Sequence, residues 1–251
     1  MSADLPADLA RLWRVHKGSR LGRPPALDVD RVVRTAVELA DRDGLPGATL
    51  PKLAAELGVT PMSLYRHVGS KEELLALMGD LAFGSPPEYA PPHDDWRDML
   101  RRWALAQWAV HRRRPWLAQL PTSGPPRGPH LVGWLDAGLR ALRDTGLDPA
   151  AQLGILTVVS GYVRNADLLT QQLAQGWLSD GTAQLEHEQT YGRQLSALVD
   201  PNRFPDAAAL FASGLFEFLP PTDDPAGEDF HFGLELILDG VAAAIRAAAL
   251  S

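Results

Sequence analysis

Residues 48–78 read ATLPKLAAELGVTPMSLYRHVGSKEELLALM and decide the fold, because they hold the start signals of three short helices. Thr49 and Thr60 are favourable N-cap residues for the first two helices. Ser70 and Glu73 have the S-x-x-E spacing of a capping box, which predicts the start of the third. The stretch therefore predicts a compact unit of short helices.

The first two of these helices are joined by a sharp turn at residues 58–60, which predicts a helix-turn-helix. The small side chain of Ala54 lets the helices approach, and Val59 and Leu64 fill their interface. The second helix presents outward the side chains of Pro61, Met62, Ser63, Tyr65, Arg66 and His67. In a major groove, hydroxyl and imidazole groups can donate to phosphates, arginine can reach base edges, and methionine can contact a thymine methyl. A helical hairpin whose polar residues merely face water is the alternative.

The chain before this unit combines a basic arm with a helix. Residues 28–43 have apolar positions at helical spacing and Asp28 as N-cap. Residues 1–27 predict a flexible basic arm that includes the sequence GRPP. Because proline keeps a chain extended and a narrow minor groove attracts arginine, Arg20 and Arg23 are candidate DNA contacts. An ordinary disordered leader is the alternative.

The stretch FGSPPEYAPPHDD predicts a linker, and the remainder has helical periodicity. Helices are predicted at about 94–114, 129–145, 148–177, 185–199, 205–217 and 227–249. No useful period-two alternation appears, so the fold class is all-α, with an N-terminal three-helix helix-turn-helix domain and a larger helical ligand-binding and dimerisation domain. The predicted boundaries are 1–27 for the arm, 28–83 for the helix-turn-helix domain with its connector helix, and 94–251 for the larger domain.

Charge is unevenly distributed between these parts. The net charge is −7, but residues 1–83 carry 11 basic and 11 acidic side chains, whereas residues 84–251 carry 13 and 20. Within residues 11–71 the count is 11 basic to 6 acidic, which fits a small polyanion-binding module on an acidic body. The absence of cysteine excludes disulfides and thiolate metal sites, and no apolar run could span a bilayer. We therefore expect a cytoplasmic protein without membrane association.

The 48–78 sequence closely resembles the N-terminal DNA-binding domain of the TetR family of repressors, over about residues 28–82. More loosely, HRRRPWLAQL, PPRGPHLVGWLDAGLRALRDTGLDP and HFGLELILDGVAAAI resemble the tetracycline-repressor-like C-terminal domains of that family. The resemblance implies a homodimer that releases double-stranded operator DNA when a small-molecule effector fills a pocket in the larger domain. At its DNA-contacting positions stand Thr49, Pro61, Met62, Ser63, Tyr65, Arg66, His67 and Lys71. Pro51 stands where the tetracycline repressors carry a base-reading arginine, so the operator need not resemble theirs.

The larger domain is rich in aromatic side chains, with six of the seven tryptophans past residue 95. A cavity with aromatic walls and a few polar groups suits a hydrophobic, antibiotic- or drug-like ligand. The candidate lining residues are Trp103, His111, Trp116, Trp134, Tyr162, Asn165 and Trp177. Plain core packing is the alternative for each aromatic residue alone. His111 has no second ligand at helical spacing, so we expect neither a metal site nor a cofactor.

The last predicted helix, 227–249, carries an apolar stripe with small alanines that suits a dimer bundle. The candidate interface residues are Leu234, Ile237, Val241 and Ile245. Burial within one chain is the alternative, and the two are compatible. A dimer would also supply two recognition helices for a palindromic operator.

The sequence contains no G-x-S-x-G, H-E-x-x-H or phosphate-binding loop, so no catalytic residue is assigned and no enzyme is expected. The predicted function is a ligand-responsive, sequence-specific transcriptional regulator, acting as a homodimeric repressor. The alternatives are a non-specific architectural DNA-binding protein, favoured by the basic arm but not by the acidic body, and a small-molecule enzyme.

Overall fold

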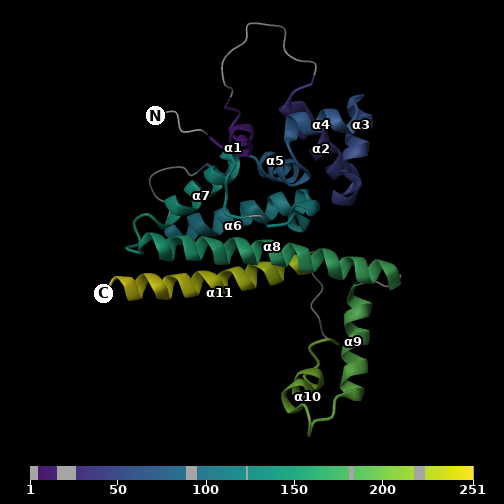
Figure 1. Ribbon diagram of the computed structural model, residues 1–251. Coiled ribbons are helices and arrows are strands. Elements are labelled where there is room, and N and C mark those ends of the chain that lie inside the picture. The colour runs from purple at the N-terminus through teal and green to yellow at the C-terminus, as the bar shows by residue number, and fades with distance from the viewer. Residues whose placement is uncertain are drawn as a thin grey trace. The chain divides into compact units, whose positions relative to one another are not determined.

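The computed structural model describes residues 5–15, 27–88, 95–122, 124–180, 184–217 and 224–250. All regular elements in these ranges are helices (Figure 1), which confirms the all-α fold. The chain forms two compact units, one of Met1–Asp167 with Leu234–Ser251 and one of Leu168–Gly233. None of the helices in the described ranges is long and apolar enough to cross a membrane.

The helices follow the sequence pattern closely. The first unit contains α1 (Ala7–Leu12), α2 (Val29–Asp43), the 3-10 helix η1 (Leu45–Gly47), α3 (Leu50–Leu57), α4 (Pro61–Val68), α5 (Lys71–Phe83), α6 (Trp96–Arg113), the 3-10 helix η2 (Pro115–Gln119), α7 (Pro129–Leu142), the first part of α8 (Pro149–Asp180) and the last part of α11 (Pro225–Ala248). The second unit contains the rest of α8 and α11 together with α9 (Gln184–Leu198) and α10 (Pro205–Ala212). α7 and α10 are shorter than predicted, and α8 is longer.

The start signals of the short helices act only partly as predicted. Thr49 Oγ1 accepts a hydrogen bond from the backbone N–H of Lys52 at 3.4 Å, as an N-cap should. Thr60 stands at the N-cap of α4, but its hydroxyl lies 3.3 Å from the hydroxyl of Ser63 and accepts no backbone N–H. Pro61 still favours a helix start there, because its ring fixes φ near the helical value.

The capping box at the start of α5 is half formed. Ser70 Oγ accepts the backbone N–H of Glu73 at 3.1 Å, as predicted. The Glu73 carboxylate accepts Arg11 Nε at 2.9 Å instead of the backbone N–H of Ser70. A guanidinium is the stronger donor, and the Ser70 N–H bonds to the carbonyl of Val68 at 2.9 Å.

Residues 7–12, which the sequence assigns to a flexible arm, form helix α1. A helix of six residues is not stable by itself, so tertiary contacts must hold it. Leu12 is 7% exposed, and Arg11 pairs with Glu73 of α5. Arg20 and Arg23 lie outside the described residues. The three predicted domain boundaries stay predictions.

Helix α5 occupies the centre of the first unit. It packs against α2, α4 and α7, and Figure 1 shows it between the α2–α4 group and α7. Leu74 and Met78 are buried, and so are Gly79 and Asp80. A helix that is covered on several faces needs no polar stripe, which explains its long apolar run.

A buried carboxylate joins α5 to α7. Asp80 is 4% exposed, its Oδ1 accepts the backbone N–H of Leu131 at 2.9 Å, and its Oδ2 lies 3.0 Å from His130 Nδ1. Asp80 thus caps the start of α7, where the N-cap residue Gly128 has no side chain. A Cβ on Gly128 would lie 2.1 Å from Asp80 Oδ1, so only glycine leaves room for this cap.

In the second unit, α9 and α10 pack against each other. The Tyr191 ring lies 5.7 Å from the Phe211 ring and 5.6 Å from the Phe216 ring, and Phe211 stacks on Phe216 at 5.5 Å. These ring contacts give the second unit a small aromatic core.

Candidate DNA-binding surface and effector cavity

The turn between α3 and α4 has the geometry of a helix-turn-helix. Gly58 has a φ of 66° and a left-handed conformation, which favours glycine. Its N–H bonds to Ala55 O at 3.1 Å, and the N–H of Val59 bonds to Ala54 O at 2.9 Å, which is a Schellman motif. Ala54 and Leu64 are buried where α3 meets α4, as the sequence predicted.

The predicted DNA contacts differ in exposure. Met62 is 70% exposed and Tyr65 41% exposed, so both side chains are accessible to a partner. Thr49, Pro61, Arg66 and Lys71 are exposed, while Ser63 and His67 are half-buried. α4 thus offers a large apolar group, a phenol and a guanidinium to a partner. Their contact with DNA stays a prediction.

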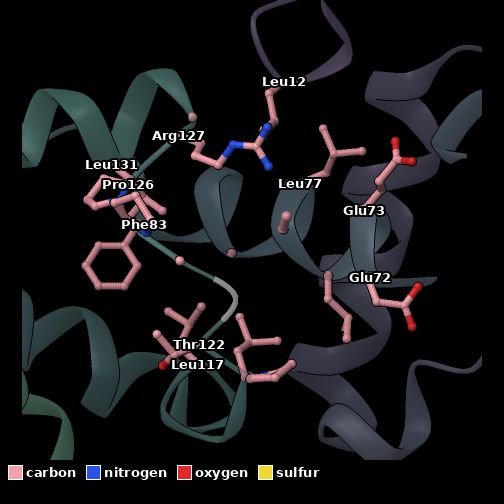
Figure 2. Close-up of a pocket in the computed structure, with 18 of the residues that line it drawn as sticks. Leu12, Glu72, Glu73, Leu77, Phe83, Leu117, Thr122, Pro126, Arg127 and Leu131 are labelled. Carbon is pink, nitrogen blue, oxygen red and sulfur yellow. The ribbon is translucent and has the colours of Figure 1, made fainter. Parts of the chain in front are cut away.

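A cavity of about 490 Å³ lies on the other side of α5 from the helix-turn-helix core. Seven residues of α5 line it, which are Glu72, Glu73, Leu75, Ala76, Leu77, Gly79 and Phe83. Figure 2 shows Leu12 and Leu117 on opposite sides of the cavity, with Phe83 and Leu131 on a third side. Outside α5 the wall contains four leucines and three prolines together with seven polar or charged residues, but most of its surface is apolar, so the cavity suits an apolar ligand.

Three polar side chains form one part of this wall, which we call the polar end: Gln107 and His111 of α6, and Arg164 of α8. Gln107 and His111 are one helical turn apart, and are 5% and 4% exposed. Gln107 Nε2 and His111 Nδ1 are buried without a hydrogen-bond partner among the described residues. Burial, together with the charge of Arg164, lowers the pKa of His111 from 6.5 to about 4, so its imidazole is neutral at physiological pH.

Helix α1 forms a further part of the wall, through Asp8 and Leu12. Arg127, which also lines the cavity, donates to Asp8 Oδ2 at 2.6 Å. The indole Nε1 of Trp13 donates to the carbonyl of Arg127 at 2.8 Å. Helix α1 and Trp13 are thereby held against the segment that precedes α7.

Seven residues were predicted to bind the ligand. Among those whose side chains the structure describes, only His111 lines this cavity. Trp103 donates to Trp134 O at 2.8 Å, and Trp134 donates to Gly84 O at 2.9 Å, so both indoles join helices inside the core. The ring of Trp134 lies 5.7 Å from Phe83, which separates it from the cavity as a second layer.

Tyr162 is half-buried and Asn165 is exposed, and neither lines the cavity, while the side chain of Trp177 lies outside the described part. The sequence missed Gln107, Arg164, Phe83 and the α1 residues. The spacing of Gln107 and His111 on one helical face was the signal that could have found the first of these.

Trp116 does not line this cavity and contacts α2 instead. Its Nε1 donates to Asp41 Oδ1 of α2 at 2.7 Å, and Arg114 Nε donates to Asp41 Oδ2 at 3.1 Å. Arg114 Nη1 also donates to the carbonyl of Ala82 at 2.8 Å. Because the next residue, Leu117, lines the cavity, η2 connects the cavity wall directly to a helix of the DNA-binding domain.

The four predicted interface residues of α11 are not equivalent. Leu234 is 0% and Val241 5% exposed within a single chain, so these two belong to its core, whereas Ile237 and Ile245 are half-buried. The exposed side of α11 instead carries Leu236, which is 58% exposed.

An ion-pair cluster attaches α11 to α6. Glu235 accepts Arg101 Nε at 2.6 Å and Arg97 Nη2 at 2.7 Å, and Arg97 also reaches Asp239. The hydrogen bond from Arg101, followed by that from Arg97, lowers the pKa of Glu235 to about 2. Within the described ranges, no three or more His, Asp or Glu side chains gather to hold a metal ion. The absence of a metal or cofactor stays a prediction.

Comparison with known proteins gives matches over both parts of the chain. Residues 32–78 match the bacterial regulatory proteins of the tetR family, and residues 87–245 match the tetracyclin repressor-like C-terminal domain.

Individual relatives are similar over most of the chain. The HTH-type transcriptional repressor DrrR1 of Streptomyces coeruleorubidus is 34% identical over 246 residues, which is 96% of this chain and 86% of that protein. The tetracycline repressor protein class E of Escherichia coli is 29% identical and covers 86% of this chain and 92% of its own length. The crystal structure of ActR from Streptomyces coelicolor in complex with actinorhodin has a TM-score of 0.67 and 25% identity, over 89% of this chain and 99% of that chain.

Proposed function

Since the chain belongs to the TetR family of bacterial transcriptional regulators, we propose that it is a homodimeric repressor that a small hydrophobic ligand releases from a palindromic operator. Members of this family bind operator DNA and small-molecule effectors, generally as dimers. An antibiotic- or drug-like effector suits the apolar cavity, and the cytoplasm is the location where the protein meets DNA.

One observation carries the proposal: α5 belongs to the cavity and to the helix-turn-helix core at once. Glu72, Ala76 and Phe83 line the cavity, while Leu74 and Met78 are buried on other faces of the same helix. Lys71, the first residue of α5, follows α4 after a two-residue turn. A ligand that displaces α5 therefore changes the position of α4, provided that it prefers the displaced state.

The DNA side of the proposal rests on α4. Tyr65 and His67 would donate to phosphates and fix the register, and Arg66 would contact a base edge. One short helix reads only a few base pairs, so two copies on a dimer are needed for useful specificity.

A selection from a random duplex library tests this function. We expect a palindrome to be enriched. Arg66→Ala should weaken the binding of the protein to this palindrome by about 1–3 kcal/mol and relax its specificity at one base position. Arg143→Ala, an exposed arginine outside the helix-turn-helix, is the matched control and should bind normally. Binding without any enriched sequence, with an affinity that merely follows the salt concentration, would refute a specific repressor and favour the architectural alternative.

A further inference from the structure

Building on the proposed function, we propose that the effector is an apolar aromatic molecule with an acidic oxygen group, and that Arg164, Gln107 and His111 receive this group at the polar end of the cavity. The apolar wall selects the ring system, and the polar end selects its acidic substituent.

Arg164 is the main reason. Its Nε donates to the carbonyl of Ala118 at 3.0 Å and its Nη2 to the carbonyl of Leu120 at 2.5 Å, while Nη1 donates to the hydroxyl of Thr122. All of these acceptors are neutral, and no carboxylate pairs with Arg164 in the part of the chain that the structure describes. The guanidinium is thus held firmly at the cavity while its charge is not balanced, which favours an anionic ligand group.

The carboxylates at the cavity do not supply this balance. Asp8 pairs with Arg127, and Glu73 pairs with Arg11. Figure 2 shows the carboxylates of Glu72 and Glu73 pointing away from the middle of the cavity. Among the described carboxylates that line the cavity, those of Asp8 and Glu73 are thus paired, and that of Glu72 does not face a ligand in its middle.

Gln107 and His111 would orient the acidic group of the ligand through hydrogen bonds. A buried amide N–H without a partner costs free energy, and a ligand oxygen in the cavity would remove this cost. The neutral imidazole of His111 can either donate a hydrogen bond to such an oxygen or accept one from a protonated oxygen of the ligand. An oxygen group between these side chains and Arg164 would balance the charge of Arg164 and pair with Gln107 and His111, whereas a purely apolar ligand would do neither.

Two fluorescent probes that differ in one group test the inference. 1-Anilinonaphthalene-8-sulfonate carries an acidic group, and N-phenyl-1-naphthylamine has the same rings without it. We expect the full-length protein to bind the sulfonate about ten- to hundredfold more tightly, because a hydrogen bond to a charged group is involved. Arg164→Gln should remove this difference and leave the affinity of the neutral probe nearly unchanged, while Arg164→Lys should retain part of it.

The neutral probe also shows whether Arg164→Gln keeps its cavity, and Arg140→Gln, on the exposed side of α7, is the matched arginine control. If Arg164→Gln no longer binds the neutral probe, Gln107→Leu is measured instead. A Gln107→Leu variant that prefers the sulfonate over the neutral probe as strongly as the unchanged protein does would contradict the inference. Equal binding of both probes by the unchanged protein overturns it outright.

Release of the selected operator separates the two proposals. Arg164-dependent binding of the sulfonate without operator release would contradict the repressor function but support the site chemistry. Release by both probes alike, independent of Arg164, would support the function and overturn the inferred ligand class.

Discussion

Acidification should destabilise this protein through His111 more than through any exposed histidine. The imidazole is 4% exposed, and its pKa is lowered from 6.5 to about 4 by burial and by the nearby charge of Arg164. The folded state therefore resists protonation, whereas the unfolded state takes up a proton near its ordinary pKa. Stability is full above a pH of about 6.5 and is lost as the pH falls towards about 4.

The magnitude follows from the two pKa values. At ~1.4 kcal/mol per pH unit, the window from 6.5 down to about 4 corresponds to about 3 kcal/mol. Between about pH 7 and about pH 5, the loss amounts to roughly 2 kcal/mol. Such a loss is a large fraction of the stability of an ordinary domain.

The assay is guanidinium unfolding at both pH values, at one fixed protein concentration because the family is generally dimeric. Carboxylates and other histidines titrate too, so the informative quantity is the difference between the unchanged protein and His111→Gln. We expect the variant to lose about 2 kcal/mol less on acidification. A pH dependence that is the same for both proteins would refute the assignment of a buried, neutral His111.

Three further perturbations test the contacts around the cavity. Trp116→Phe removes the indole donor to Asp41 while keeping a ring, so operator affinity should persist while ligand-induced release weakens by about fivefold or more in a fluorescence-anisotropy titration. Asp80→Ala leaves the N–H of Leu131 without its acceptor and should lower the free energy of unfolding, measured with denaturant, by about 1–3 kcal/mol. The exposed Asp136→Ala is the control and should change it by no more than about 0.5 kcal/mol. Leu12→Ala removes part of the cavity wall and should weaken probe binding by about 1–2 kcal/mol, measured by fluorescence; unchanged affinity would show that α1 does not contribute to the site.

Local signals were sufficient for the helices but not for the cavity. Gly58 and Thr49 mark helix ends through interactions with residues a few positions away, and such interactions can be read from the sequence. The contact of Trp116 could not be predicted because its partner, Asp41, lies 75 positions earlier in the chain. An indole that is apolar along its body and polar at one atom fits a ligand site and a core equally well.

The same limit explains α1. Local interactions alone do not keep so short a helix folded, and the groups that hold it, Glu73 and Arg127, come from elsewhere in the fold. Arg164 was missed for a related reason. No carboxylate of the described residues pairs with it, which only the packed structure reveals.

A cavity wall built from α1 has consequences for both protein engineering and evolution. If the cavity binds the effector as proposed, an affinity tag fused near Ala7, or a truncation to the start of α2, would alter the effector response while leaving the recognition helix intact. Chain ends tolerate insertions, deletions and fusions better than packed helices do. In the proposed repressor, substitutions in α1 would thus change effector preference without altering the operator that α4 reads.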